Sequence, residues 1–161
     1  MRGFPSGREG HDGADMGGLT GDVLLSLPVR LHGIQVGHAV DVLLDRETFR
    51  VVGLDVLCGD EVHRFLPLPT ATVTGDDLVI LSPLVLLEED ELAFYRSRAF
   101  ALSSLRGRPV MSKRAQLGKL KDILVRKDGA LLAVEVEANG KTERVPFGDS
   151  VRFAPASRTA A

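Results

Sequence analysis

Tryptophan is absent from this sequence, and tyrosine and cysteine each occur once. Because Cys58 is alone, no disulfide can form within the chain, which excludes a small fold stapled by disulfides. Aromatic residues make up only 5% of the 161 residues, so we expect a core built mainly from leucine and valine. The longest apolar run, residues 78–87, contains Ser82 and Pro83 and is far shorter than the ~20 residues of a membrane-spanning helix.

Motifs that bind phosphate groups or activate nucleophiles are also missing. Segment 17–21 is rich in glycine but lacks the lysine of a phosphate-binding loop, and no serine-nucleophile elbow or zinc-binding His-Glu-x-x-His motif occurs. Cys58 ends an apolar run and is expected to be a small buried residue. The histidines are spread out and expected at the surface or at strand edges: His11, His32, His38 and His63. We therefore expect no catalytic, cofactor-binding or metal-binding residues, and a protein that is not an enzyme.

The small net charge of −2 hides an uneven distribution. Residues 1–100 contain 8 arginines and 16 acidic residues, whereas residues 101–161 contain 12 basic and 6 acidic residues. Two interpretations fit: the halves attract each other, or the basic half binds an acidic partner. The basic residues that are candidates for partner binding are Arg106, Arg108, Lys113, Arg114, Lys119 and Lys121.

What the sequence does contain is an internal repeat. Three pairs of identical residues lie 81 positions apart: Pro28 and Pro109, Gly37 and Gly118, and Asp41 and Asp122. After a shift of one residue, 51–56 aligns with 131–136. A repeat of this length predicts two small domains, and because domains of this size bury little surface alone, we expect them to pack on each other.

Local patterns predict strands, tight turns and one helix. Asp128-Gly129 and Asn139-Gly140 separate apolar runs, and both dipeptides are typical of tight hairpin turns that need positive φ. Residues 86–98 begin with acidic and end with basic side chains, as the helix dipole favours, and Ser82-Pro83 is a plausible start signal. Residues 1–21 lack the apolar segment of a signal peptide, so we expect a flexible tail and a cytoplasmic location.

The segments 105–110, 117–125 and 144–151 resemble the opening, centre and close of the PRC-barrel family. Segments 27–33 and 65–73 are similar to it more loosely. The resemblance implies an all-β fold of two small, strongly bent β-barrels in tandem. It also implies that the signature residues are structural, with Asp122 anchoring a turn and Pro146 ending a strand; they are Gly37, Asp41, Gly107, Gly118, Asp122 and Pro146.

The repeat and the resemblance together predict the domain organisation. We expect a flexible tail (1–22), a first barrel-like repeat (23–85), a linker helix (86–100), a second repeat (101–154) and a flexible tail (155–161).

Because protein docking is common to members of the PRC-barrel family, the resemblance predicts a non-enzymatic interaction or adaptor module. We expect it to bind an unidentified protein partner and no cofactor. Two alternatives stay open: a ribosome- or RNA-associated factor that uses the basic stretch, and a protein attached to the soluble face of a membrane-protein complex.

Overall fold

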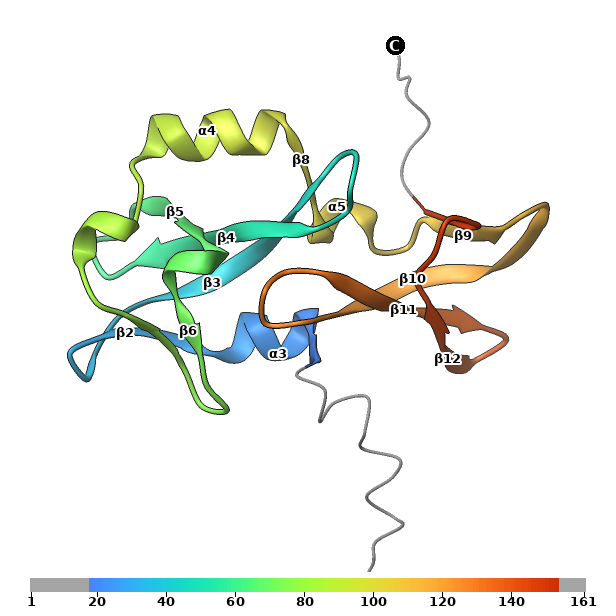
Figure 1. Ribbon diagram of the computed structural model, residues 1–161, viewed down its shortest axis with the longest axis horizontal. Coiled ribbons are helices and arrows are strands. Elements are labelled where there is room, and N and C mark those ends of the chain that lie inside the picture. Colours follow the sequence, from blue (N-terminus) through green and yellow to red (C-terminus); the bar gives the residue numbers. More distant parts are fainter. Residues whose placement is uncertain (1–17, 154–161) are drawn as a thin grey trace, which may run out of the picture.

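A computed structural model describes residues 18–153, which form two β-sheets and few helices (Figure 1). The first sheet, which we call the first lobe, contains β2 Pro28–Leu31, β3 Ile34–Asp45, β4 Val51–Cys58, β5 His63–Pro67, β6 Thr72–Val73, β7 Leu78–Ile80 and β8 Ala99–Ala101. The second sheet, the second lobe, contains β1 Leu19–Thr20, β9 Pro109–Ser112, β10 Ala115–Val125, β11 Leu131–Ala138, β12 Lys141–Pro146 and β13 Val151–Arg152. The helices are α3 Gly21–Ser26, α4 Glu89–Ser97 and α5 Leu102–Leu105, with 3-10 turns η1 Leu68–Thr70 and η2 Pro83–Val85.

The predicted mostly β architecture is confirmed, and two boundaries need correction. The expected tails, 1–22 and 155–161, lie largely outside the described residues, but β1 and the start of α3 occupy residues 19–22, where a tail was predicted. The predicted linker helix is α4, which is shorter than expected. Ser82 caps η2 through the Leu84 N–H and does not start α4, whose first turn is instead closed by a capping box between Glu88 and Glu91.

The long strands β3 and β10 bend at matching places. Each carries a register shift just before its aspartate, Asp41 in β3 and Asp122 in β10. Gly118 has a φ of 151°, and a Cβ there would run into the Glu137 carbonyl oxygen. At Gly37 a Cβ would lie 2.7 Å from the Leu57 carbonyl oxygen. Both glycines therefore allow a neighbouring strand to approach closely, as expected of Gly118.

The two predicted hairpin turns differ in type. Asn139 and Gly140 both have positive φ, which confirms a two-residue primed turn between β11 and β12. Between β10 and β11 only Gly129 has positive φ. The Gly129 N–H donates to the Arg126 carbonyl oxygen and the Arg126 N–H to that of Ala130, which makes a three-residue loop with a glycine bulge. The hairpin predicted at Asp128-Gly129 is therefore confirmed, but its turn is not of the primed type.

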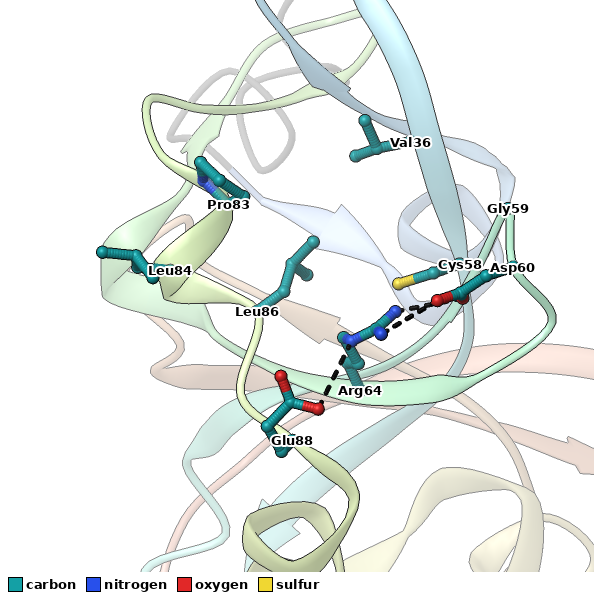
Figure 2. Close-up of a pocket in the computed structure, with 9 residues that line it drawn as sticks. All are labelled: Val36, Cys58, Gly59, Asp60, Arg64, Pro83, Leu84, Leu86 and Glu88. Atoms are coloured by element: carbon teal, nitrogen blue, oxygen red, sulfur yellow. Dashed lines mark hydrogen bonds and ion pairs between the residues drawn. The ribbon is translucent and has the colours of Figure 1, made fainter.

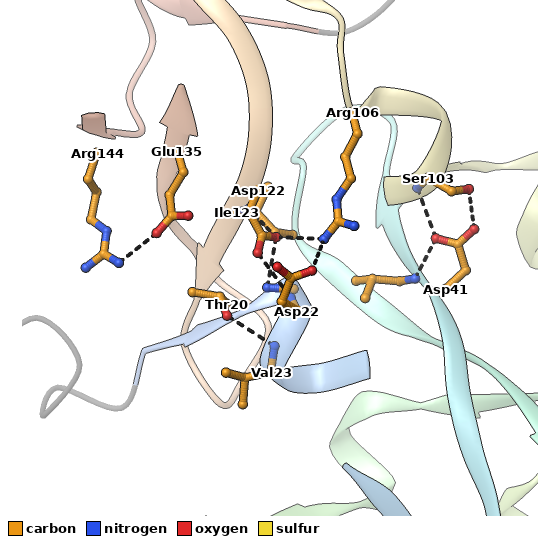
Figure 3. Close-up of polar contacts among 12 residues, drawn as sticks. Thr20, Asp22, Val23, Asp41, Ser103, Arg106, Asp122, Ile123, Glu135 and Arg144 are labelled. Atoms are coloured by element: carbon orange, nitrogen blue, oxygen red, sulfur yellow. Dashed lines mark hydrogen bonds and ion pairs between the residues drawn. The ribbon is translucent and has the colours of Figure 1, made fainter. Parts of the chain in front are cut away.

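Each sheet includes one short strand, which we call an arm, from the chain segment that adjoins the other lobe. β1, which precedes the first lobe, pairs with β10 in the second, and β8 pairs with β3 in the first. In the helix that follows each arm, backbone N–H groups of the first turn donate to a carboxylate of the lobe that the arm joins (Figure 3). Asp122 accepts the Gly21 N–H at 3.0 Å and the Asp22 N–H at 3.1 Å, and Asp41 accepts the Ser103 N–H at 3.1 Å and the Ser103 hydroxyl.

Asp122 thus serves another role than the predicted one. It lies within strand β10, not in a turn, and it holds the arm of the other lobe. Pro146 ends β12 as predicted, and Gly107 adopts a φ of 87° directly after α5.

One continuous apolar core joins the lobes. Its buried members come from both sheets and from α3, and include Val29, Leu120, Val134 and the α3 residue Leu24. Phe49, from the β3–β4 turn, contacts the rings of Phe100, Phe147 and Phe153 where the lobes meet. The hairpin tips also touch, because the Val51 N–H donates to the Gly129 carbonyl oxygen at 2.8 Å.

Candidate functional site

The basic stretch of the second lobe is divided among several environments. Arg106 pairs with Asp22 at 2.8 Å and with the buried Asp122 at 3.3 Å, so it serves the arm contact. Arg108 is half-buried. Lys113 and Arg114 lie at the turn between β9 and β10.

Lys119 and Lys121 are exposed on β10 and lie beside acidic neighbours or polar groups. Lys119 stands opposite Glu137 on β11, and the Lys121 ammonium donates to the Thr142 hydroxyl at 3.2 Å. The six predicted residues therefore do not form one uncompensated positive face.

A groove lies at the outer end of the first lobe. Its main part has a volume of about 400 Å³ (Figure 2). Side chains from β3, the end of β4, β5, η2 and the start of α4 line it. They are Val36, Cys58, Gly59, Asp60, Arg64, Pro83, Leu84, Leu86 and Glu88. A second hollow of about 300 Å³ shares Val36, Cys58 and Gly59, so the depression continues along β3 and β4.

Apolar side chains line much of the groove, and three exposed apolar residues, which we call the lip, lie at the same end of the first lobe; of these, Leu84 belongs to the groove lining. Leu84 is 84% exposed and Leu81 79%, and Ile34 at the start of β3 is 68% exposed. Strand register places them at the same end of the sheet, because Ile80 pairs with Leu31 and Leu31 with Ile34. Soluble proteins rarely leave several large apolar side chains so exposed at one place without a binding role.

Charged residues form the rim. Arg64 makes two parallel hydrogen bonds to Asp60, at 3.0 and 2.9 Å, and its Nε lies 3.9 Å from Glu88. Hydrogen bonds from Arg64 lower the pKa of Asp60. Asp60 first, and then the Cys58 sulfur, raise the pKa of Arg64. Arg64 is therefore neutralised locally.

Glu88 adds an exposed carboxylate to the groove lining. Four further exposed carboxylates lie next to the lining residues in sequence: Glu61, Glu89, Asp90 and Glu91. With Arg64 matched by Asp60, the groove presents an excess of negative charge.

Other residues considered in the sequence analysis also lie at or near the groove. Cys58 is buried, at 8% exposure, as expected, but it also lines the groove. The acidic run that begins α4 follows the lining residue Glu88. The lip residues Leu81 and Leu84 were missed, because the run 78–87 was judged only on whether it could span a membrane. Their position around a Ser-Pro helix break was the available signal.

A second polar cluster lies between α4 and the sheet. The buried Asp55 on β4 accepts a contact from His63 Nδ1 at 2.8 Å and an ion pair from Arg96 on α4. The His63 and Arg96 side chains are half-exposed. Because Arg96 lies on α4 and Asp55 on β4, the cluster attaches α4 to the first lobe.

Two kinds of feature are absent from residues 18–153. No three His, Cys, Asp or Glu side chains converge so as to hold a metal ion. No helix in this range is long and apolar enough to cross a bilayer.

Comparison with known families gives one match. Residues 97–155 match the PRC-barrel domain, which confirms the resemblance noted for the second half of the sequence. The matched range runs from the end of α4 to just beyond β13 and includes none of the strands β2–β7. No curated protein matches the chain.

Proposed function

We propose that this chain, whose residues 97–155 match the PRC-barrel domain, is built from two tandem barrel-like copies and acts as a non-enzymatic protein-interaction module. The exchanged arms support the duplication. Thr20 stands opposite Leu124 in one junction and Ala101 opposite Leu43 in the other, and each residue is 81 positions from its counterpart. The aspartates that hold the two arms keep the same spacing.

The groove of the first lobe carries the functional proposal. A fold alone does not determine function, so the argument rests on the site. An apolar depression with an exposed apolar lip suits the insertion of a side chain from another protein, because burying Leu84 and Leu81 would remove apolar surface from water.

The charges around the groove favour a partner segment of one sign of charge. Since Arg64 is matched by Asp60 while Glu61 and Glu88 are exposed, a basic segment would be attracted and an acidic one repelled. The proposed occupant is a protein segment that places one large apolar side chain in the groove, with lysine or arginine on both sides of it.

Peptide binding to the full chain tests this proposal. Two peptide sets carry a central Leu or Phe flanked either by Lys and Arg or by Asp and Glu, and fluorescence anisotropy measures their affinities. We expect the basic set to bind about tenfold or more tightly than the acidic set, with affinity falling as salt increases.

Leu84→Ser is the informative variant, because Leu84 is exposed and its loss should leave the fold intact. It should weaken binding of the basic peptides at least about fivefold. Val40→Ser, on the same strand as Val36 but outside the groove lining, is the matched control. Equal binding of both peptide sets, or unchanged binding by Leu84→Ser, would contradict the proposal.

A further inference from the structure

The edge strand β12 has unused backbone hydrogen-bonding groups. Among residues 18–153, β12 pairs only with β11 (Figure 1). The two-residue turn at Asn139-Gly140 makes Ala138 and Lys141 a doubly hydrogen-bonded pair, and such pairs recur at every second residue. The Phe147 N–H donates to the Leu132 carbonyl oxygen at 2.9 Å, in agreement with this alternation.

It follows which groups face outward. Lys141, Glu143 and Val145 direct their backbone groups to β11. Thr142 and Arg144 therefore direct their N–H and C=O groups away from the sheet, toward solvent, and both residues are exposed.

The first lobe shows what can occupy such an edge. Phe65 on β5 stands opposite Asp55, just as Arg144 stands opposite Glu135 on the corresponding strands. Phe65 exchanges two hydrogen bonds with Leu87, N–H to oxygen at 3.0 Å and oxygen to N–H at 2.8 Å. A short extended segment of the chain thus adds to the first sheet at the position that Arg144 occupies in the second.

We propose that β12 is a strand-addition site that takes an extended segment of a partner protein with an acidic residue opposite Arg144. Backbone groups of Thr142 and Arg144 supply hydrogen bonds that any extended segment can use, and the side chains supply the selection. The Arg144 side chain is 47% exposed, and one of its guanidinium nitrogens donates to Glu135 at 2.8 Å. Lys121 lies on the same face, at Thr142, and adds positive charge.

A second copy of this chain fits the edge poorly. Antiparallel self-pairing over the whole strand sets Glu143 opposite Glu143 of the second copy. A shift of one pair sets arginine opposite arginine at residue 144. A shift the other way pairs only residues 141–143 before the turns at Asn139-Gly140 intervene. Like charges directly opposite each other destabilise strand pairing, so a different protein is the favoured occupant.

The test uses the full chain and synthetic peptides of sequence Thr-Val-Thr-Xaa-Thr-Val-Thr, where Xaa is Glu, Ser or Lys. Amide hydrogen exchange followed by NMR reports on Thr142 and Arg144, and titration gives the affinities. We expect the Glu peptide to bind about fivefold more tightly than the Lys peptide and to slow exchange at these two amides.

Arg144→Pro removes the outward N–H as well as the guanidinium, and proline is tolerated at an edge position whose N–H faces solvent. It should abolish binding, whereas Arg144→Ala keeps the N–H and should lose only the preference for Glu. Leu84→Ser should have no effect here, which separates this site from the groove. Thermal unfolding of each variant checks the fold.

Three outcomes would overturn the proposal. The first is no saturable binding of any peptide at millimolar concentration. The second is binding that Arg144→Pro leaves unchanged. The third is slow exchange at Thr142 and Arg144 without peptide, together with a concentration-dependent dimer in sedimentation, which would assign the edge to a second copy.

Discussion

The two lobes share a bent strand pair and differ in what surrounds it. Between β5 and β8 the first lobe inserts η1, β6, β7, η2 and α4, which cover the β5 edge through Leu87 and build the groove. In the second lobe the chain passes from β12 directly to the short β13, and β12 keeps an open edge. Both proposed binding sites lie where the lobes differ, so the shared strands serve as a scaffold for different surfaces.

The two arm contacts differ in burial. Asp122 is 2% exposed and accepts N–H groups of Gly21, Asp22 and Ile123 besides its ion pair with Arg106. Asp41 is only half-buried and pairs with no arginine among residues 18–153. We therefore expect the two equivalent aspartates to contribute unequally to the stability of the fold.

The largest expected effect comes from removing these carboxylates. Asp122→Ala leaves the buried N–H groups of Gly21 and Ile123 without an acceptor and removes one of the two carboxylates that pair with Arg106, so the free energy of unfolding should fall by about 3 kcal/mol. Asp41→Ala should cost about 1 kcal/mol, since solvent can replace the lost hydrogen bonds. Urea unfolding measures both, with the exposed Asp149→Ala as a control. Equal losses would show that burial does not distinguish the junctions.

The strand-bend glycines should show a smaller contrast. Gly118→Ala combines a φ of 151° with a clash against the Glu137 carbonyl oxygen, and should destabilise by about 2 kcal/mol. Gly37→Ala meets the Leu57 oxygen at 2.7 Å without the positive φ, and should cost about half as much. Gly148→Ala, where a Cβ meets no atom within 4 Å, is the control. Thermal unfolding ranks the three, and a neutral Gly118→Ala would contradict the close approach.

The smallest effect concerns the two equivalent hairpins. Hydrogen bonds from the Arg126 side chain lower the pKa of Asp128 from 3.8 to about 2. In the first lobe, the backbone N–H groups of Thr48 and then Glu47 lower the pKa of Asp45. Because the folded pKa of Asp128 is depressed, its contribution is present above pH ~4 and is lost as pH falls toward about 2.

NMR titration of both carboxyl groups measures this difference. Arg126→Ala should move the pKa of Asp128 up toward 3.8 and leave that of Asp45 unchanged. High salt should act in the same direction on Asp128, because it screens the ion pair. A shift of the Asp45 pKa in the variant would mean that the hairpins are coupled.

Local chemistry predicted the strand framework well. Asn139-Gly140 specifies its turn, since both residues tolerate positive φ, and alternation in 133–137 specifies the buried face of β11. Asp128-Gly129 marked its hairpin correctly but not the type of turn, because only Gly129 takes positive φ and a dipeptide does not reveal whether a third residue joins the loop.

The arms and the groove were beyond local patterns. β1 has two residues and gains its place from a partner about a hundred positions away, which no periodicity records. The groove draws on Val36, Arg64 and Leu84 from separate segments. The ion pairs of Arg106 were also beyond local patterns, because Asp22 and Asp122 lie far from Arg106 in the sequence.

The exchange of arms has a consequence for the order of events during translation. The N–H of Gly21 finds its acceptor 101 residues later, at Asp122. At roughly 5–20 residues per second, the ribosome delivers that acceptor on the order of ten seconds after the arm emerges. Neither sheet can therefore be completed from one continuous stretch of the chain, and β1 is synthesised long before the strand with which it pairs.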